Sequence, residues 1–296
     1  MTDAEYNFFL QDRVQKIQQM DKQYDLRNKA LIAFSGGKDS TVLSHIIDKA
    51  LPDNEIPRVY TQTAIEYSLV QKFINEFAAK DPRFVQIKLN FNLREMLEKY
   101  GYPFKSKEHA EKLSTYQKSG IGSKSVQSYL NKTSFGCPKI LREQFTPEYK
   151  LKCSKDCCRK LKKEPFAKFQ KEAGRPISIT GIRKAEGGAR ASSSCAVFQG
   201  KDLHKFNPLF VVNDDFLQQY IERERVAISD IYKAPYNFER TGCLGCPFNK
   251  DLQSALDTMQ EFFPQDRKKA ELLWKPVYDE YRRLGYRLKP QEENNG

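Results

Sequence analysis

The sequence lacks a long apolar run and is poor in histidine. No segment approaches the roughly 20 apolar residues that a membrane-spanning helix needs, and the N-terminus lacks the basic-then-apolar order of a signal peptide. We therefore expect a cytoplasmic protein with no membrane partner. Three scattered histidines have no partner at the spacing of a metal site or a catalytic triad, so they are interpreted as structural or surface residues: His45, His109 and His204.

Acidic residues are outnumbered, because 50 Lys and Arg stand against 38 Asp and Glu and give a net charge of +12. This balance favours anionic partners, either small phosphorylated molecules or nucleic acid, although a lysine-rich solvated surface is the commoner cause. A Lys- and Ser-rich stretch at about residues 99–152 is expected to be an insertion of loops and short helices. It is either a solvated lid or spacer, or a basic surface for a polyanion whose aromatic side chains stack on bases: Tyr100, Tyr102, Phe104, Tyr116 and Tyr129.

Predicted strands and helices alternate along the rest of the chain. Short apolar, β-branched segments predict strands at residues 31–34, 58–63, 84–89 and 177–181. Apolar residues at helical spacing predict helices at residues 6–27, 41–49 and 68–80. Alternation of this kind implies an α/β protein with a Rossmann-like, mostly parallel sheet that carries helices on both faces.

The domain organisation follows from this pattern. We expect a lead-in helix over residues 1–27, one α/β domain over residues 28–248 that contains the insertion, and a helical C-terminal extension over residues 249–296. Ligands of such sheets bind beyond the carboxyl ends of the strands. The loops at residues 35–40, 61–66 and 181–190 would meet there.

A glycine-rich loop separates the first strand from the following helix: Ser35, Gly36, Gly37, Lys38, Asp39 and Ser40. Its glycines let backbone N–H groups approach an anion, the helix N-terminus points its positive end at the same place, and Lys38 adds a full charge. A Walker A loop needs four residues between its first Gly and the Gly-Lys-Ser/Thr, whereas here the glycines are adjacent and Asp39 follows Lys38. The loop is therefore predicted to bind phosphate without being a Walker loop. A plain glycine turn is the alternative.

Four of the seven cysteines form two close pairs, Cys157 with Cys158 and Cys243 with Cys246. Disulfides are not expected in the cytoplasm, so the clustering indicates metal or sulfur chemistry. Four thiolates suffice for a tetrahedral zinc or an iron–sulfur cluster. Zinc ribbons favour two or more residues between the cysteines of each half-site, so the adjacent pair favours a cluster.

The other cysteines and the single tryptophan have weaker cases. Cys153 lies one helical turn before Cys157 and either substitutes as a ligand or packs. Cys195 follows a serine run and suits an exposed sulfur-relay thiol, or is a small buried apolar residue. Cys137 has the weakest case for a function. Trp274 is interpreted as core packing, with a partner surface as the alternative.

Together these motifs resemble a known family. Residues 35–40 are similar to the PP-loop of the ATP pyrophosphatase superfamily, whose members cut ATP between its α and β phosphates and usually adenylylate a substrate. The cysteine pairs, with Lys162 and Pro165 after the first, resemble the iron–sulfur adenylylsulfate (APS) reductase branch of the phosphoadenosine phosphosulfate (PAPS) reductase family. Residues 181–191 resemble that family's segment that places arginines on the phosphosulfate.

The resemblance spans about residues 31–248 and implies an adenine nucleotide alpha hydrolase-like fold with helical N- and C-terminal additions. It also implies that a 4Fe-4S cluster is bound by four thiolates, with Lys162 near enough to tune it: Cys157, Cys158, Cys243 and Cys246. Whether such a cluster is structural or presents sulfur is left open by the sequence.

One departure from the family decides the expected function. Its sulfonucleotide reductases use a nucleophilic cysteine near the C-terminus, and this sequence has no cysteine after Cys246. The loop is similar to that of relatives that hydrolyse ATP, including the DNA phosphorothioation ATPase and tRNA thiolation enzymes. We therefore expect an adenylylating sulfur-transfer enzyme that cleaves ATP to AMP and pyrophosphate. Its acceptor is DNA, tRNA or a small metabolite, and a cysteine desulfurase is the expected sulfur donor.

In this hypothesis ATP is held by residues 35–40 and Mg²⁺ bridges its phosphates. Lys38, Arg183 and Arg190 would offset the charge that develops on the phosphates. Asp39 would orient Lys38 or hold the metal through water, and Ser40 would contribute its hydroxyl. Glu66 is either a metal or ribose contact or a carboxylate at a helix start.

Two other functions remain open. An APS or PAPS reductase would bind a sulfonated nucleotide and need a thiol from Cys195 or from a partner protein. A non-catalytic nucleotide- or nucleic-acid-binding module would keep the loop and the basic insertion without turning over ATP.

Overall fold

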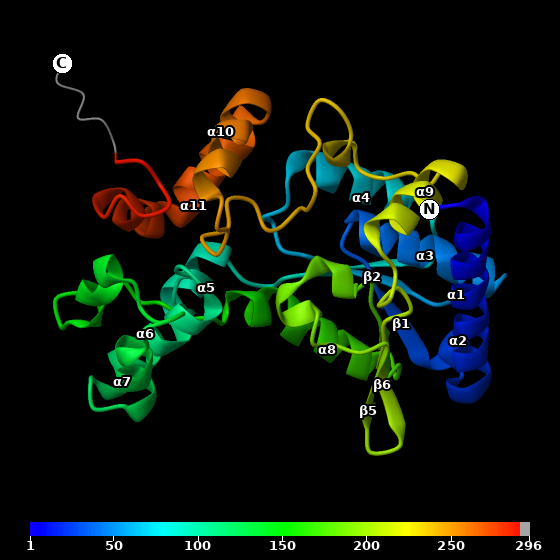
Figure 1. Cartoon of the computed structure of the whole chain (residues 1–296), viewed down its shortest axis with the longest axis horizontal. Coiled ribbons are helices and arrows are strands. Elements are labelled where there is room, and N and C mark those ends of the chain that lie inside the picture. Colours follow the sequence, from blue (N-terminus) through cyan, green and yellow to red (C-terminus); the bar gives the residue numbers. More distant parts are fainter. Residues whose placement is uncertain (291–296) are drawn as a thin grey trace. The chain divides into compact units, whose positions relative to one another are not determined.

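A six-stranded sheet organises the part of the chain that carries the glycine-rich loop (Figure 1). Its strands are β1 (Ala30–Ala33), β2 (Arg58–Gln62), β3 (Phe84–Lys88), β4 (Ile177–Ile179), β5 (Ala196–Gln199) and β6 (Asp202–Phe206). They lie in the order β3-β2-β1-β4-β6-β5, and all neighbours are parallel except the β5–β6 hairpin. The expected mostly parallel α/β sheet is confirmed, and the direction of winding reverses between β1 and β4.

The structure is a computed structural model that describes residues 1–290. The chain divides into two units. Unit 1 holds the sheet and comprises Met1–Gln62, Leu69–Lys88 and Pro165–Thr241; unit 2 comprises Thr63–Ser68, Leu89–Glu164 and the chain from Gly242 onwards. The final residues of the expected C-terminal extension, 291–296, lie outside the described residues.

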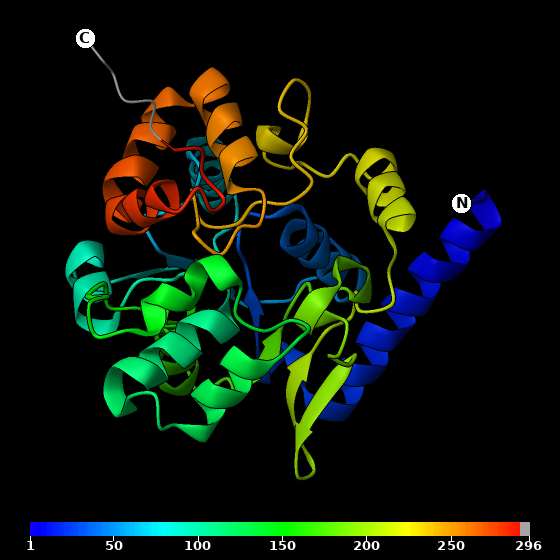
Figure 2. The same ribbon diagram turned by 60° about the vertical axis from the view of Figure 1, so that its left-hand side comes forward.

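Helices cover both faces of the sheet in unit 1. The helices α3 (Lys38–Ala50) and α4 (Ser68–Lys80) lie on one face and α8 (Glu164–Glu172) on the other (Figures 1 and 2). The N-terminal helix α1 (Asp3–Tyr24) opens with a capping box between Thr2 and Glu5 and packs against α3 and α9 (Asp214–Arg223). A short helix, α2 (Leu26–Lys29), leads directly into β1.

Buried apolar side chains join these layers. In β1, Leu31 and Ile32 are fully buried, and α3 adds a stripe at helical spacing: Val42, Leu43, Ile46 and Ile47. The predicted strands agree with the structure to within two residues. The helix expected at residues 41–49 begins earlier, at Lys38, so the second half of the glycine-rich loop is already helical. The β5–β6 hairpin was not predicted.

Unit 2 is mostly helical. Its helices are α5 (Leu93–Tyr100), α6 (Lys107–Ser119), α7 (Lys124–Asn131), α10 (Leu252–Phe262) and α11 (Pro264–Arg283), with a 3-10 helix at Lys139–Phe145 and a π-helical turn at Arg159–Lys163. The helical N- and C-terminal additions to the α/β fold are confirmed. Across residues 1–290, none of the helices combines the length and the apolar character that crossing a membrane requires.

A buried histidine lies in the core of unit 2. His109, in the first turn of α6, is fully buried; its Nδ1 lies 3.0 Å from the Tyr129 hydroxyl and its Nε2 lies 2.9 Å from Oε1 of Gln144. Burial lowers the pKa of His109 from 6.5 to about 4. The sequence-based interpretation of His109 as structural agrees with this position.

The shifted pKa predicts a pH dependence of stability. Between pH 6.5 and pH 4 the unfolded chain binds a proton on His109 that the folded chain does not, so the free energy of unfolding should fall as the pH falls. From pH 7 to pH 5 the loss from this group is about 2 kcal/mol. Urea unfolding of the wild type and of His109→Gln at both pH values measures it. The control, His204→Gln at an exposed position, should keep the wild-type dependence, and an equal dependence in His109→Gln would contradict the prediction.

Candidate functional site

The glycine-rich loop is closed by hydrogen bonds between its own residues. The Ser35 hydroxyl lies 3.0 Å from that of Ser40 and accepts from the Gly37 N–H at 3.3 Å, while the Ser40 hydroxyl donates to the Gly37 carbonyl at 2.9 Å. Gly37 is the N-cap of α3 and has no side chain with which to cap the helix, and the Tyr232 hydroxyl accepts a hydrogen bond from the Lys38 N–H. Phosphate binding at this helix N-terminus stays a prediction.

Gly36 is a position where only glycine fits. Its φ is +71°, and a Cβ there would lie 2.7 Å from Cγ1 of Ile74 and 3.2 Å from Cγ1 of Val70. The backbone of the loop at Gly36 therefore lies in direct contact with α4. This contact fixes the conformation in which the loop can present its N–H groups.

A cavity of about 200 Å³ opens at this loop. It is lined by residues that follow β1 and by residues that follow β4, so it lies at the carboxyl ends of the strands on either side of the reversal point. Six of the predicted site residues line it: Ser35, Gly37, Lys38, Asp39, Ser40 and Arg190. Three predicted residues, Gly36, Arg183 and Glu66, are not among its lining residues.

Lys38 and Arg190 supply positive charge to the cavity. The Lys38 ammonium lies 5.9 Å from the centre of the Tyr232 ring and forms no ion pair with any carboxylate of residues 1–290. Arg190 is bound to Glu186, which also pairs with Arg240 at 3.3 Å. Burial and the neighbouring Arg240 lower the pKa of Arg190, which shows that cationic groups crowd this site.

Arg183 is placed beside the cavity rather than in it. Its side chain is buried, and its guanidinium binds Asp39 and lies 2.8 Å from Oδ1 of Asp214. A further N–H group approaches the Val212 carbonyl at 3.4 Å. Arg183 thus holds Asp39 in place and has most of its donors engaged within the protein.

Two side chains that line the site, those of Tyr232 and Arg240, were not predicted. Tyr232, in a 3-10 turn (Asp230–Tyr232), donates or accepts a hydrogen bond of 2.7 Å with the Thr241 hydroxyl and lines the cavity beside Gly37. Arg240 lines it from the same segment. These residues lie about 200 positions after the loop in a stretch without a phosphate-binding motif, so no sequence signal pointed to them.

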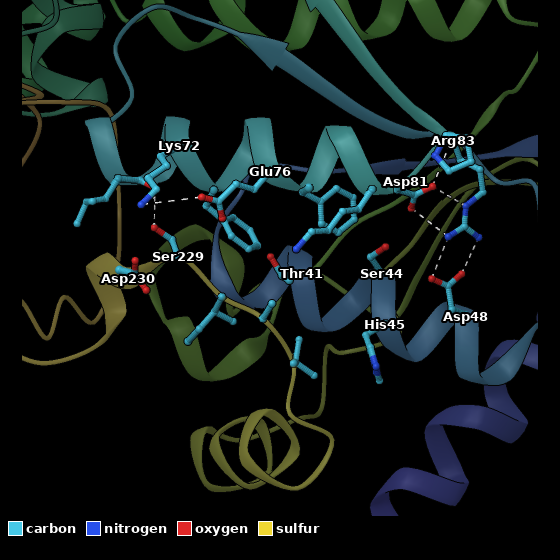
Figure 3. A pocket seen from close by; sticks show the side chains of 18 of the residues that line it. Thr41, Ser44, His45, Asp48, Lys72, Glu76, Asp81, Arg83, Ser229 and Asp230 are labelled. Carbon is cyan, nitrogen blue, oxygen red and sulfur yellow. Dashed lines mark hydrogen bonds and ion pairs between the residues drawn. The ribbon is translucent and has the colours of Figure 1, made fainter.

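A larger cavity of about 690 Å³ lies between α3, α4 and residues 226–233 (Figure 3). Its charged groups are largely paired with one another: Arg83 lies 2.8 Å from Asp48 and 2.8 Å from Asp81. None of the predicted site residues lines it. The 200 Å³ cavity is therefore the candidate site.

The four paired cysteines come together within unit 2. Burial, and then the thiols of Cys243, Cys158 and Cys246, raise the pKa of Cys157. Burial, and then Cys243, raises the pKa of Cys246 to about 12. Residues 85 positions apart in the sequence are thus close enough to interact electrostatically. Within the described part of the chain, no group of three or more His, Cys, Asp and Glu side chains has the arrangement of a site for a metal ion.

Two charged side chains accompany the cysteines. Lys162 is hydrogen-bonded to Cys243, and the Cys243 thiolate form raises the pKa of Lys162. Glu66 lies near both: its Oε1 accepts from the Thr63 N–H at 3.0 Å and from the Thr63 hydroxyl at 2.6 Å. Its Oε2 is buried without a hydrogen-bond partner. Such an orphaned carboxylate oxygen is costly unless a further group completes the site.

The C-terminal helix holds the loop of the second cysteine pair. Trp274 Nε1 donates to the Leu244 carbonyl at 2.8 Å, the Tyr278 hydroxyl donates to the Gly245 carbonyl, and the Tyr281 hydroxyl donates to the Pro247 carbonyl at 2.9 Å. Trp274 is fully buried, as its interpretation as core packing predicted, but it also positions this loop. Gly245 has a φ of +56°, and a Cβ there would lie 2.7 Å from Cβ of Ala270.

The other three cysteines lie in different surroundings. Cys153 is buried 3.8 Å from the Tyr149 hydroxyl, and Cys137 is buried beside Lys105. Burial raises the pKa of Cys137 to about 11 and that of Cys153 to about 12. Cys195 belongs to unit 1 and is partly exposed.

The crowding at Gly36 predicts a specific loss of stability. Gly36→Ala should lower the free energy of unfolding by about 1–2 kcal/mol for the positive φ and by a further 1–3 kcal/mol, roughly, for the contact with Ile74. Gly174 is a matched control, because its φ is +64° and nothing lies within 4 Å of the added Cβ. Urea unfolding of both variants measures the difference. Equal losses would show that α4 does not confine the loop.

Comparison with known proteins gives distant relatives. The chain is 23% identical over 286 residues to the uncharacterized protein MJ0973 of Methanocaldococcus jannaschii. The match covers 93% of this chain and 55% of that protein, so the chain spans about half of that relative's length.

Solved structures resemble the chain at low identity. The phosphoadenylyl-sulfate (PAPS) reductase of Candida auris, in a phosphate complex, is 14% identical with a TM-score of 0.45, over 82% of this chain and 96% of that one. FMN adenylyltransferase of Candida glabrata is 13% identical with a TM-score of 0.49, over 82% and 62%. The U34-tRNA thiolase NcsA of Methanococcus maripaludis, with its [4Fe-4S] cluster, is 13% identical with a TM-score of 0.40, over 98% and 84%. No functional assignment rests on these similarities.

A protein-family model matches far more decisively. The model of the phosphoadenosine phosphosulfate reductase domain matches residues 29–136 and 124–249. These ranges contain the glycine-rich loop, the arginine segment and both cysteine pairs. Because they cover well over half of its length, the chain belongs to the phosphoadenosine phosphosulfate reductase domain family, within the adenine nucleotide alpha hydrolase-like (PP-loop) superfamily.

Proposed function

We propose that the protein is an ATP-dependent adenylylating enzyme that takes part in sulfur transfer and carries a 4Fe-4S cluster. The observation that carries the proposal is the cavity at residues 35–40. The N-terminus of α3, an ammonium group without a carboxylate partner and two guanidinium groups that share Glu186 converge on one space of about 200 Å³. This combination suits a polyphosphate better than any neutral ligand.

In this proposal ATP binds in the cavity and is cleaved at its α-phosphate. The N–H groups of α3 and the Lys38 ammonium bind the phosphates, and Arg190 and Arg240 face them from the other side of the cavity. An acceptor oxygen attacks the α-phosphorus, the bond to the bridging oxygen breaks, and pyrophosphate leaves with the negative charge. Lys38 and Arg190 stabilise that charge as it develops, which is the main form of catalysis where positioning outweighs proton transfer. Mg²⁺ bound to the phosphates would supply further charge compensation.

Asp39 and Arg183 have supporting roles in this proposal. Arg183 acts through Asp39, because its guanidinium binds that carboxylate while the rest of its donors reach Asp214 and Val212. With Asp39 fixed in this way, its second oxygen can orient a water molecule of the metal. Tyr232 packs against Lys38 and holds its stem over the loop.

In this proposal the cysteine group in unit 2 would hold the iron–sulfur cluster, because thiolates are the usual ligands of such clusters. The four cysteines interact with one another, two of them are held by a loop whose carbonyls are engaged by α11, and Lys162 offsets negative charge at Cys243. Cys157, Cys158, Cys243 and Cys246 would hold the cluster, which supplies either a structural link or a site for sulfur. A cysteine desulfurase remains the proposed sulfur donor, and the acceptor is proposed below.

ATP binding and cleavage test the nucleotide part of the proposal. Lys38→Ala should weaken ATP binding and lower pyrophosphate release by about 100-fold, because it removes charge stabilisation at the leaving group. Titration calorimetry and a coupled pyrophosphate assay measure the two quantities. Lys184→Ala, an exposed lysine outside the cavity, is the control and should match the wild type. Sulfite formation from APS or PAPS without cleavage of ATP would instead identify a sulfonucleotide reductase.

Iron content tests the cluster independently. Anaerobically purified wild type should contain iron and acid-labile sulfide with a broad visible absorption band, and Cys243→Ser should lose most of both. Cys195→Ser, which removes a thiol of unit 1, should retain them. Zinc in place of iron, or full iron content in Cys243→Ser, would contradict the assignment.

A further inference from the structure

Residues 112–142 of unit 2 form a stretch without an acidic side chain. Between Glu111 and Glu143 the sequence carries six basic residues: Lys112, Lys118, Lys124, Lys132, Lys139 and Arg142. Serines and threonines lie between them. We call the exposed side chains of residues 118–139 the donor surface; they belong to the end of α6, to α7 and to the loops on either side of α7. Ammonium and hydroxyl groups donate hydrogen bonds, so this surface suits a ligand rich in anionic acceptors.

The exposed large apolar side chains of the donor surface, Ile121 and Phe135, lie in the loops on either side of α7 and not on the helix. Helix α7 buries its two large side chains, Val126 and Tyr129, against unit 2. Its outward residues are polar, including the exposed Lys124, Ser125 and Ser128. An amphipathic helix that lies on a membrane or in a partner's groove needs a continuous apolar face, and α7 does not offer one.

One aromatic side chain stands out from this surface. Phe135 is 92% exposed and has a φ of +57°, an uncommon backbone conformation for a bulky residue. The loop that carries it is closed by a hydrogen bond of 3.2 Å from the Cys137 N–H to the Tyr129 carbonyl. The exposed phenyl ring lies between Lys132, whose ammonium pairs with Glu108 at 3.2 Å, and the exposed Lys139, so it combines a stacking surface with a nearby positive charge.

Most of the aromatic residues that the sequence suggested for stacking are unavailable. The prediction is wrong for Tyr102, Phe104 and Tyr129, which are buried in unit 2. Tyr100 lies under the Lys160 ammonium at 4.5 Å, and Tyr116 packs against Phe145. Phe135 was not considered, because a phenylalanine beside Gly136 carries no sequence signal of exposure.

We propose that the donor surface binds single-stranded nucleic acid, with its lysines and serines on the phosphates and Phe135 stacked on a base. Hydroxyl and ammonium donors recognise the sugar–phosphate backbone without reading sequence, and an aromatic ring can stack on any base that is not paired. That the bound nucleic acid is the acceptor for adenylylation or sulfur transfer rests on the proposed function. That the donor surface binds nucleic acid does not depend on the proposed function.

Fluorescence anisotropy tests the proposal on the full chain without ATP. Labelled oligo-uridine and oligo-thymidine of about 12 nucleotides distinguish RNA from DNA. Phe135→Ala should weaken binding about 5- to 100-fold through loss of one stacked base. The double variant Lys124→Gln/Lys139→Gln should reduce the slope of log affinity against log salt by about 1.4.

Matched controls come from the β5–β6 hairpin of unit 1. Phe198 is 46% exposed and Lys201 is exposed in the turn, so Phe198→Ala and Lys201→Gln should leave affinity and salt slope unchanged. Thermal unfolding of every variant checks the fold. Because the Phe135 side chain is almost fully exposed, Phe135→Ala should be about as stable as the wild type.

Several results would overturn the proposal. The first is that the wild type does not bind the oligonucleotides, and the second is that Phe135→Ala and Lys124→Gln/Lys139→Gln both bind them with wild-type affinity. The third is that poly-glutamate binds as tightly as the oligonucleotides. The fourth is that the protein binds phosphatidylserine vesicles through Phe135 and does not bind the oligonucleotides. Pyrophosphate release measured on the same samples separates the two proposals. A wild type that binds oligonucleotides but does not cleave ATP would contradict the proposed function alone, and one that cleaves ATP but does not bind them would contradict the donor surface alone.

Discussion

The ion pair between the buried Arg183 and Asp39 is the constraint on which the candidate site depends. Asp39 lies in the first turn of α3, where its carboxylate would otherwise neutralise the cations that the phosphates require. Arg183 binds that carboxylate from the loop after β4, and Asp214 at the start of α9 completes the guanidinium's partners. The negative charge of the loop is thereby satisfied internally. Of the cations that line the cavity, Lys38 forms no ion pair with a carboxylate of residues 1–290, whereas Arg190 and Arg240 share Glu186.

The same ion pair joins segments that are far apart in the chain. Residue 39 follows β1, residue 183 follows β4 and residue 214 begins α9. Because β1 and β4 are adjacent and parallel, their carboxyl ends bring these side chains together without any long-range loop. The sheet order therefore determines which charges can compensate one another at the site.

Sequence reasoning succeeded where a local pattern has one physical cause. The glycine-rich loop, the alternation of strands and helices and the pairing of cysteines each follow from short-range chemistry, and the structure places the loop at the strand ends as expected. It did not find Tyr232 or Arg240, because their role depends on a tertiary contact with α3 and with Glu186. The aromatic residues of the insertion show the same limit, because the spacing of residues in the sequence does not reveal which side chains the fold will bury. The π-helical turn that carries Lys162 toward Cys243 also has no sequence signature.

The division of the chain into units has a consequence for its synthesis. The polypeptide passes from one unit to the other at residues 62–63, 68–69, 88–89, 164–165 and 241–242. A growing chain on the ribosome therefore cannot finish the sheet unit until β4 and β6 have emerged, and it cannot finish the helical unit until α11 has followed Cys246 out of the exit tunnel. Until α11 has emerged, the loop of Cys243 and Cys246 lacks the tryptophan and tyrosine side chains that bind its carbonyls. This loop can therefore reach its folded conformation only after α11 has been synthesised.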